Sequence, residues 1–149
     1  MTHNDVFRAI RHILNVRDAK LIEIIRLAGV EVSLEDVVAY LKSEEEPGYK
    51  EMGDDIMAPF LDGLVFFKRG KDESRPLLPT DKRITNNVIL KKVRVAFELK
   101  DADIVPLIEK SGLKITKSEL SAFFRSADHR NFRPCGDQFL RNLLKGLCV

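Results

Sequence analysis

The chain has 149 residues, of which 44% are hydrophobic and 32% charged, and its formal net charge at pH 7 is +2. This composition is typical of a globular protein without a disordered tail, and no apolar run approaches the roughly 18 residues that a membrane span requires. The first residues include an early acid and no apolar run, so they predict neither a signal nor a transit peptide, and we expect a cytoplasmic protein. Cys135 and Cys148 are expected to be free thiols, and because no Cys or His pair has zinc-ligand spacing we expect no metal and no cofactor.

The dominant feature of the chain is an internal repeat. Sliding the sequence by 83 positions aligns residues 4–66 with residues 87–149 without a gap, and 13 of the 63 aligned positions are identical. Chance does not produce an ungapped match of this kind, and a repeat constrains the choice of fold. We therefore predict a first helical repeat over 1–69, an exposed linker rich in proline and charge over 70–85, and a second helical repeat over 86–149.

Each copy is predicted to contain four helices. The first follows Asn4 or Asn87, each a candidate N-cap, and carries apolar residues at helical spacing. The second begins near Asp18 or Asp101 and is apolar nearly all round, so we expect it to be the central and most buried helix. It ends at a glycine, Gly29 in the first copy, where the chain needs a residue that accepts a positive φ.

A capping box predicts the start of the third helix in both copies. Ser33 is followed three positions later by Asp36, and Thr116 by Glu119. In such a box the hydroxyl and the carboxylate satisfy free N–H groups at the helix start. The pattern is specific because it occurs twice in register.

The fourth helix is predicted to run from about Asp54 in the first copy and Asp137 in the second, to Gly63 or its equivalent and beyond. Two prolines lie inside predicted helices. Pro59 lies about five residues into this fourth helix, and Pro106 lies as far into the second helix of the second copy. Because an internal proline removes a donor and clashes one turn back, we expect those helices to begin late or to bend.

These elements define an all-α fold of two tandem four-helix repeats. A unit of about 65 residues buries only about 60% of its unfolded surface, so the two copies are expected to share a core. Open stacked arrays need about three repeats for stability, which favours two copies closed on each other with pseudo-twofold symmetry.

The motifs of the repeat resemble those of a known family. With φ for an apolar residue, each copy reads Asn-x-x-φ-φ-x-x-φ-Arg, Asp-Ala, a Gly-ended helix, Ser/Thr-x-x-Asp/Glu, Gly-Asp and Leu-x-Gly-Leu. This pattern, most specific over 135–147, is similar to that of the YehS-like bacterial proteins, which carry one domain of unknown function twice. The first copy departs from it with Met52 in place of Cys135. The resemblance implies the fold and brings no activity.

Polar residues that recur in register are expected to be structural. They are Asn4, Arg11, Asp18 and Asp54 in the first copy and Asn87, Arg94, Asp101 and Asp137 in the second. Each arginine borders an apolar face, and a partly buried guanidinium needs a carboxylate, which either recurring aspartate could supply. We favour an ion pair or cap that fixes the unit over a repeated anion site.

The second and third helices of each copy resemble a helix-turn-helix with a glycine in the turn. In the first copy the third helix is acidic, which would repel phosphate. The second copy is compatible with a phosphate-contacting surface made of basic residues, namely Lys114, Lys117, Arg125, Arg130 and Arg133.

The two halves of the chain differ in charge. Residues 1–70 hold 9 Lys and Arg against 13 Asp and Glu, whereas residues 71–149 hold 16 Lys and Arg against 10 Asp and Glu. This split also fits attraction between the two halves, within one chain or between chains.

The sequence offers few candidates for catalytic residues. Cys135 near a predicted helix start, with His129 as the nearest base, is more readily explained as a small buried thiol beside a capping aspartate. We therefore predict no catalytic residues and a non-enzymatic protein-interaction module, whose partner is another protein or a second copy of the chain. The alternative is a nucleic-acid-binding protein that uses the basic second repeat.

Overall fold

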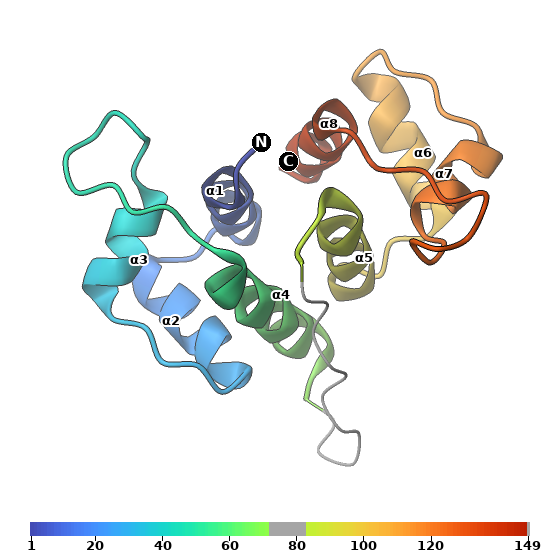
Figure 1. Ribbon diagram of the computed structural model, residues 1–149. Coiled ribbons are helices and arrows are strands. Elements are labelled where there is room, and N and C mark those ends of the chain that lie inside the picture. Colours follow the sequence, from blue (N-terminus) through green and yellow to red (C-terminus); the bar gives the residue numbers. More distant parts are fainter. Residues whose placement is uncertain (72–82, 149) are drawn as a thin grey trace.

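The computed structural model of the protein describes residues 1–71 and 83–148. Within these ranges the protein is all-α, and its helices are α1 (His3–Leu14), α2 (Asp18–Leu27), α3 (Leu34–Leu41), α4 (Asp54–Arg69), α5 (Asn86–Ala96), α6 (Asp101–Lys110), α7 (Lys117–Phe123) and α8 (Asp137–Leu147). Helices α1 to α4 form the first copy and α5 to α8 the second (Figure 1), which confirms the predicted tandem repeat. The expected linker over 70–85 lies mostly outside the described residues and stays a prediction.

None of the described helices is both long enough and apolar enough to cross a membrane.

The predicted stops and starts around the third helices are present. Gly29 and Gly112 have φ values of +85° and +90°, the left-handed region that favours glycine. The Ser33 hydroxyl accepts a hydrogen bond from the Asp36 backbone N–H. Thr116 and Glu119 complete the reciprocal box, because the Glu119 carboxylate also accepts from the Thr116 backbone N–H.

The N-cap prediction for Asn4 and Asn87 is wrong. The caps are Thr2 and Thr85, whose hydroxyls accept hydrogen bonds from backbone N–H groups three residues on. Asn4 is therefore the second residue of α1, and it is fully buried. An inward-facing amide so near the helix start has the same sequence signature as a cap.

Of the two effects expected of the prolines, the late start is wrong, and the bend stays a prediction. Pro59 and Pro106 lie inside α4 and α6, which begin five residues earlier at Asp54 and Asp101. The first four N–H groups of a helix have no intrahelical partner, so proline at the sixth position removes one hydrogen bond close to the helix start. Each helix continues past its proline.

The two copies share a core. Buried apolar side chains from both belong to one continuous cluster. Across the interface α4 packs on α5 and α1 packs on α8 (Figure 1). The first helix of each copy thus meets the fourth helix of the other, which is the exchange expected of pseudo-twofold symmetry.

The central helix is α4, so the prediction that gave this place to the second helix is wrong. Helix α4 packs on α2 of its own copy and on α5 of the other. Its buried residues are Met57, Ala58, Phe60, Leu61, Gly63 and Leu64. The pattern of one copy could not show which helix faces the other copy.

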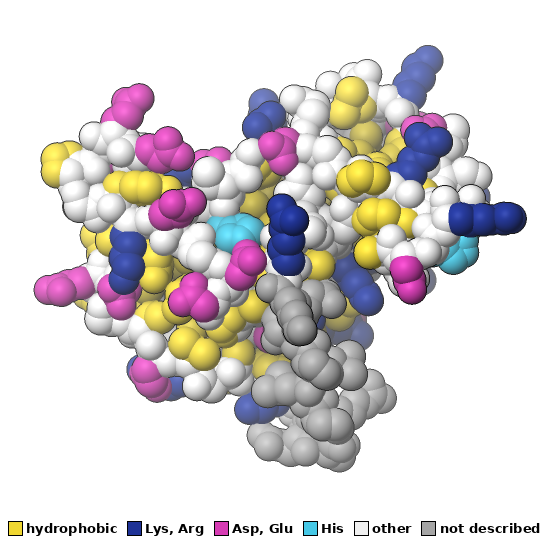
Figure 2. All heavy atoms as spheres, viewed as in Figure 1, with side chains coloured by type: hydrophobic (Ala, Val, Ile, Leu, Met, Phe, Trp, Pro, Cys, Tyr) yellow, Lys and Arg dark blue, Asp and Glu magenta, His cyan; other side chains and the backbone are white. Residues whose placement is uncertain are grey.

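The charge split of the sequence is visible on the surface. Figure 2 shows acidic side chains gathered mainly over the first copy and basic side chains mainly over the second. The shared core between the copies is apolar.

Candidate functional site

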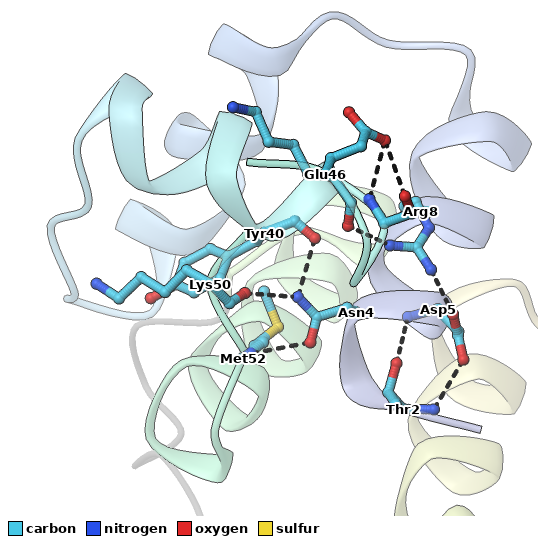
Figure 3. A network of polar contacts seen from close by, with 10 residues as sticks. Thr2, Asn4, Asp5, Arg8, Tyr40, Glu46, Lys50 and Met52 are labelled. Carbon is cyan, nitrogen blue, oxygen red and sulfur yellow. Dashed lines mark hydrogen bonds and ion pairs between the residues drawn. The ribbon is translucent and has the colours of Figure 1, made fainter. Parts of the chain in front are cut away.

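The buried side chain of Asn4 holds three distant segments of the first copy together (Figure 3). Its Nδ2 donates to the Tyr40 carbonyl at 3.0 Å and to the Lys50 carbonyl at 2.8 Å, and its Oδ1 accepts from the Met52 N–H at 2.9 Å. Asn4 thereby fixes the end of α3 and the loop that leads to α4. Buried polar groups need hydrogen-bond partners, so few other side chains could replace an amide that satisfies three of them.

The second copy repeats this arrangement at the equivalent positions. The Asn87 amide donates to the Phe123 and Arg133 carbonyls at 3.0 and 2.9 Å and accepts from the Cys135 N–H at 2.8 Å. We call each arrangement the asparagine clamp. In the second copy the clamp positions the loop between α7 and α8, which carries most of the predicted phosphate-contacting residues.

The recurring arginines are paired with the aspartates that begin the second helices. Arg11 Nε lies 3.0 Å from Asp18 Oδ1, in an ion pair that lacks hydrogen-bond geometry. Arg94 Nη2 lies 3.1 Å from Asp101 Oδ1, and its guanidinium lies 4.3 Å from the centre of the Phe124 ring. Both arginines thus face carboxylates of the protein itself, an arrangement that supports a structural role over an anion site.

The other recurring aspartates connect the copies. His3 Nε2 lies 2.6 Å from Asp54, and Asn86 Nδ2 donates to Asp137 at 2.7 Å. The hydrogen bonds to Asp54 from His3 and then from the Ile84 backbone N–H, which belongs to the second half of the chain, lower the pKa of this carboxyl. The Met1 amino group lies 2.6 Å from Asp137, and its hydrogen bond, followed by that of Asn86, lowers the pKa of Asp137. His3 and Asn86 were not predicted as site residues, although they occupy equivalent positions in the two copies.

Cys135 is a poor nucleophile. The side chain is buried, and burial followed by the charge of Asp137 raises its pKa to about 12. His129 accepts a hydrogen bond from the Asn131 backbone N–H and lies 3.5 Å from Arg125. A thiol with this pKa is protonated at neutral pH, and the thiolate is the reactive form.

Four of the five predicted basic residues come together. Lys117 of α7 and Arg125, Arg130 and Arg133 of the following loop line a surface depression of about 510 Å³, which we call the basic hollow. Its other lining residues are Ser118, Glu119, Ser121, Ala122, Asn131 and Phe132. Lys114 is exposed but does not line it. Phe132 was not predicted as part of this site, since its role depends on how the loop folds back on α7.

The first copy lacks an equivalent cationic surface. Leu34 and Pro47 occupy the positions of Lys117 and Arg130. The two cations that remain are engaged by their own copy, because Lys42 donates to the Pro47 carbonyl at 2.8 Å and Lys50 pairs with Asp36 at 3.3 Å. The two copies have therefore kept the clamp and the ion pair while their outer surfaces have diverged.

The fold and these sites define an all-α protein built from two copies of one four-helix unit. The family described as "Protein of unknown function (DUF1456)" matches residues 3–70 and 86–149, and the chain belongs to this family. The chain is 43% identical over 149 residues to the "Uncharacterized protein YehS" of Escherichia coli (strain K12), a match that covers 100% of this chain and 96% of that protein. The resemblance to the YehS-like proteins is thus confirmed. No solved structure matches the chain.

Proposed function

We propose that the chain is a non-enzymatic binding protein whose second copy holds the phosphate backbone of single-stranded nucleic acid in the basic hollow. The observation that carries this proposal is the convergence of four cationic side chains on one concave surface. None of the four forms an ion pair with a described residue, whereas Arg94 nearby is paired with Asp101. Unpaired lysine and arginine side chains gain most from phosphate contacts, because binding releases the counterions of the nucleic acid.

A single strand fits the hollow better than a duplex. Phe132 lines the hollow beside the cations, and a base stacked on an aromatic ring contributes about 1–3 kcal/mol. An all-α protein that reads a duplex from the major groove does so with a helix that projects into the groove. Helix α7 has only 7 residues and forms one wall of the depression.

The non-enzymatic part of the proposal is supported by the chemistry of the one candidate nucleophile. The pKa of Cys135 is raised to about 12, and the general base suggested by the sequence, His129, is engaged with the loop that carries it. Neither group is arranged for nucleophilic catalysis.

The test is fluorescence anisotropy with a labelled single strand of about 16 nucleotides and with a duplex of the same length. Four phosphate contacts to a single strand predict a salt slope of about −2.8, roughly a fifty-fold loss of affinity between about 50 and 200 mM salt. Arg125→Gln with Arg130→Gln should reduce this slope by about 1.4.

The matched control is Arg141→Gln with Lys145→Gln, which removes the same charge from exposed positions of α8 outside the hollow. This control should leave most of the affinity intact. Absence of binding at about 50 mM salt, or an equal loss in both double variants, would overturn the proposal.

A second candidate function, a protein-interaction module, is favoured by the outer face of α3. Leu34 and Val38 on this helix are 53% and 37% exposed. They lie one helical turn apart, so they form a small apolar stripe rather than scattered exposed residues.

A further inference from the structure

The outer face of the first copy combines exposed apolar and acidic side chains. Leu34, Glu35 and Val38 lie on α3, Glu44 and Glu45 lie in the loop that follows it, and all five are exposed. The three glutamates form no ion pair with a described residue, whereas Asp36 between them is paired with Lys50. We call these five residues the acidic ridge.

The acidic ridge and the basic hollow occupy equivalent places in the two copies. Shifted by 83 positions, Leu34 corresponds to Lys117 and Val38 to Ser121, both of which line the hollow. The same helix face is therefore apolar and acidic in one copy and polar and basic in the other. Over residues 31–50 there are six acids and two lysines, and over residues 114–133 there are five basic residues and two acids.

The two surfaces cannot meet within one molecule. Figure 1 places α3 and its loop at one end and α7 at the other, with α1, α4, α5 and α8 between them. Figure 2 shows acidic side chains over the first of these ends and basic side chains over the second. Attraction between these surfaces must therefore act between molecules.

We infer that the occupant of the acidic ridge is a second copy of this chain, which docks the ridge into its basic hollow head to tail. Charge complementarity selects this partner over an unrelated one, since free carboxylates and free cations of one chain face outward at opposite ends. The apolar stripe gives the contact a dry centre, against Phe132 in the hollow. Because the contact joins two different surfaces, a pair of molecules still has one free ridge and one free hollow, and association continues beyond two chains.

This inference rests on the proposed function, because the ridge and the nucleic acid use the same hollow. Nucleic acid and the ridge of another molecule exclude each other there. Self-association therefore limits access to the hollow at high protein and low salt concentrations.

Sedimentation velocity of the full chain, from micromolar to near-millimolar concentration, tests the contact. At low salt the average mass should rise above that of one chain and pass that of two, and high salt should reverse the rise. Glu35→Lys should weaken association about tenfold, because it places like charges together. Glu109→Lys changes an exposed glutamate of α6 by the same charge and should leave association unchanged.

Mixing variants tests the pairing directly. Arg125→Glu alone should also weaken association, whereas an equal mixture of the Glu35→Lys and Arg125→Glu proteins should associate more strongly than either variant alone. A chain that stays monomeric at low salt, or an equal effect of Glu35→Lys and Glu109→Lys, would overturn the inference.

The nucleic-acid titration separates the two proposals. The Glu35→Lys protein should bind the labelled single strand at least as tightly as the unchanged protein, because its competitor is lost. If self-association is absent and the strand still binds, only the inference fails. If self-association follows the pattern above and no strand binds, only the proposed function fails.

Discussion

Asn4 and Asn87 make the same three hydrogen bonds in different surroundings. Asn4 is fully buried, whereas Asn87 is only partly buried. Replacing Asn4 by alanine should lower the free energy of unfolding by about 3 kcal/mol, since two carbonyls and one N–H lose their partner away from water. Asn87→Ala should have a smaller effect because water can reach the vacated groups.

Urea unfolding followed by circular dichroism measures both changes. Asn131→Ala is the control, as this exposed side chain makes no hydrogen bond with a described residue, and its effect should stay within about 0.5 kcal/mol. Equal losses in Asn4→Ala and Asn131→Ala would show that the clamp does not stabilise the fold.

The clamp also shows what one sequence can and cannot predict at this scale. Identity of Asn4 and Asn87 in register predicted a structural role, but the role assigned, an N-cap, was wrong. A cap bonds to residues two or three positions on, whereas the clamp bonds to groups up to 48 residues away. Such long-range partners leave no local pattern. The basic hollow was easier to predict, because four of the five basic residues lie close together in sequence, on one short helix and the loop after it.

The packing of the fourth helix on the second depends on Gly63 in the first copy more than on Gly146 in the second. A Cβ at Gly63 in α4 would lie 1.9 Å from the backbone oxygen of Ile24 in α2. At Gly146 in α8, the nearest atoms would be side-chain carbons of Leu107 at 3.4 Å, an ordinary contact. The fourth helix therefore approaches the second more closely in the first copy.

Gly63→Ala should destabilise the protein by about 2–4 kcal/mol, because backbone atoms must move apart. Gly146→Ala should change stability by less than about 1 kcal/mol, since alanine also favours the helix. Thermal unfolding of the two variants gives the comparison directly. Equal melting temperatures would mean that α2 and α4 separate without penalty.

The helices themselves were largely predictable, whereas the order of burial was not. Capping at Ser33 and Thr116, and the left-handed Gly29, are decided by neighbours in sequence. The central place of α4 is decided by α5, which lies in the other copy. A periodic apolar pattern reports that a helix has a buried face, and it does not say how many neighbours share that face.

At the scale of the whole molecule, Asp54 and Asp137 tie each copy to the start of the other. Asp54 interacts with His3 of its own copy and with the Ile84 N–H, whereas Asp137 interacts with Asn86 of its own copy and with the Met1 amino group. Both carboxyls have lowered pKa values in the folded protein. Their ordinary value in an unfolded chain is about 3.9.

The lowered pKa values fix the direction of the pH dependence. Above a pH of about 5 both carboxyls are charged whether the chain is folded or not, and the stabilisation is fully present. As the pH falls through the folded-state pKa values, the folded protein takes up the protons and the stabilisation is lost. The contribution of each is below about 1 kcal/mol, because the side chains of Asp54 and Asp137 are 42% and 49% exposed and screened by water.

The double variant Asp54→Asn and Asp137→Asn should therefore be slightly less stable than the unchanged protein at neutral pH and nearly equal to it near pH 2. Urea unfolding from pH 7 to pH 2 measures the difference, with Asp55→Asn as a control, because this exposed neighbour forms no ion pair with a described residue. A difference that persists at pH 2 would assign the loss to altered packing. A difference that closes with acid, in the double variant alone, would show that charge at these two positions joins the copies.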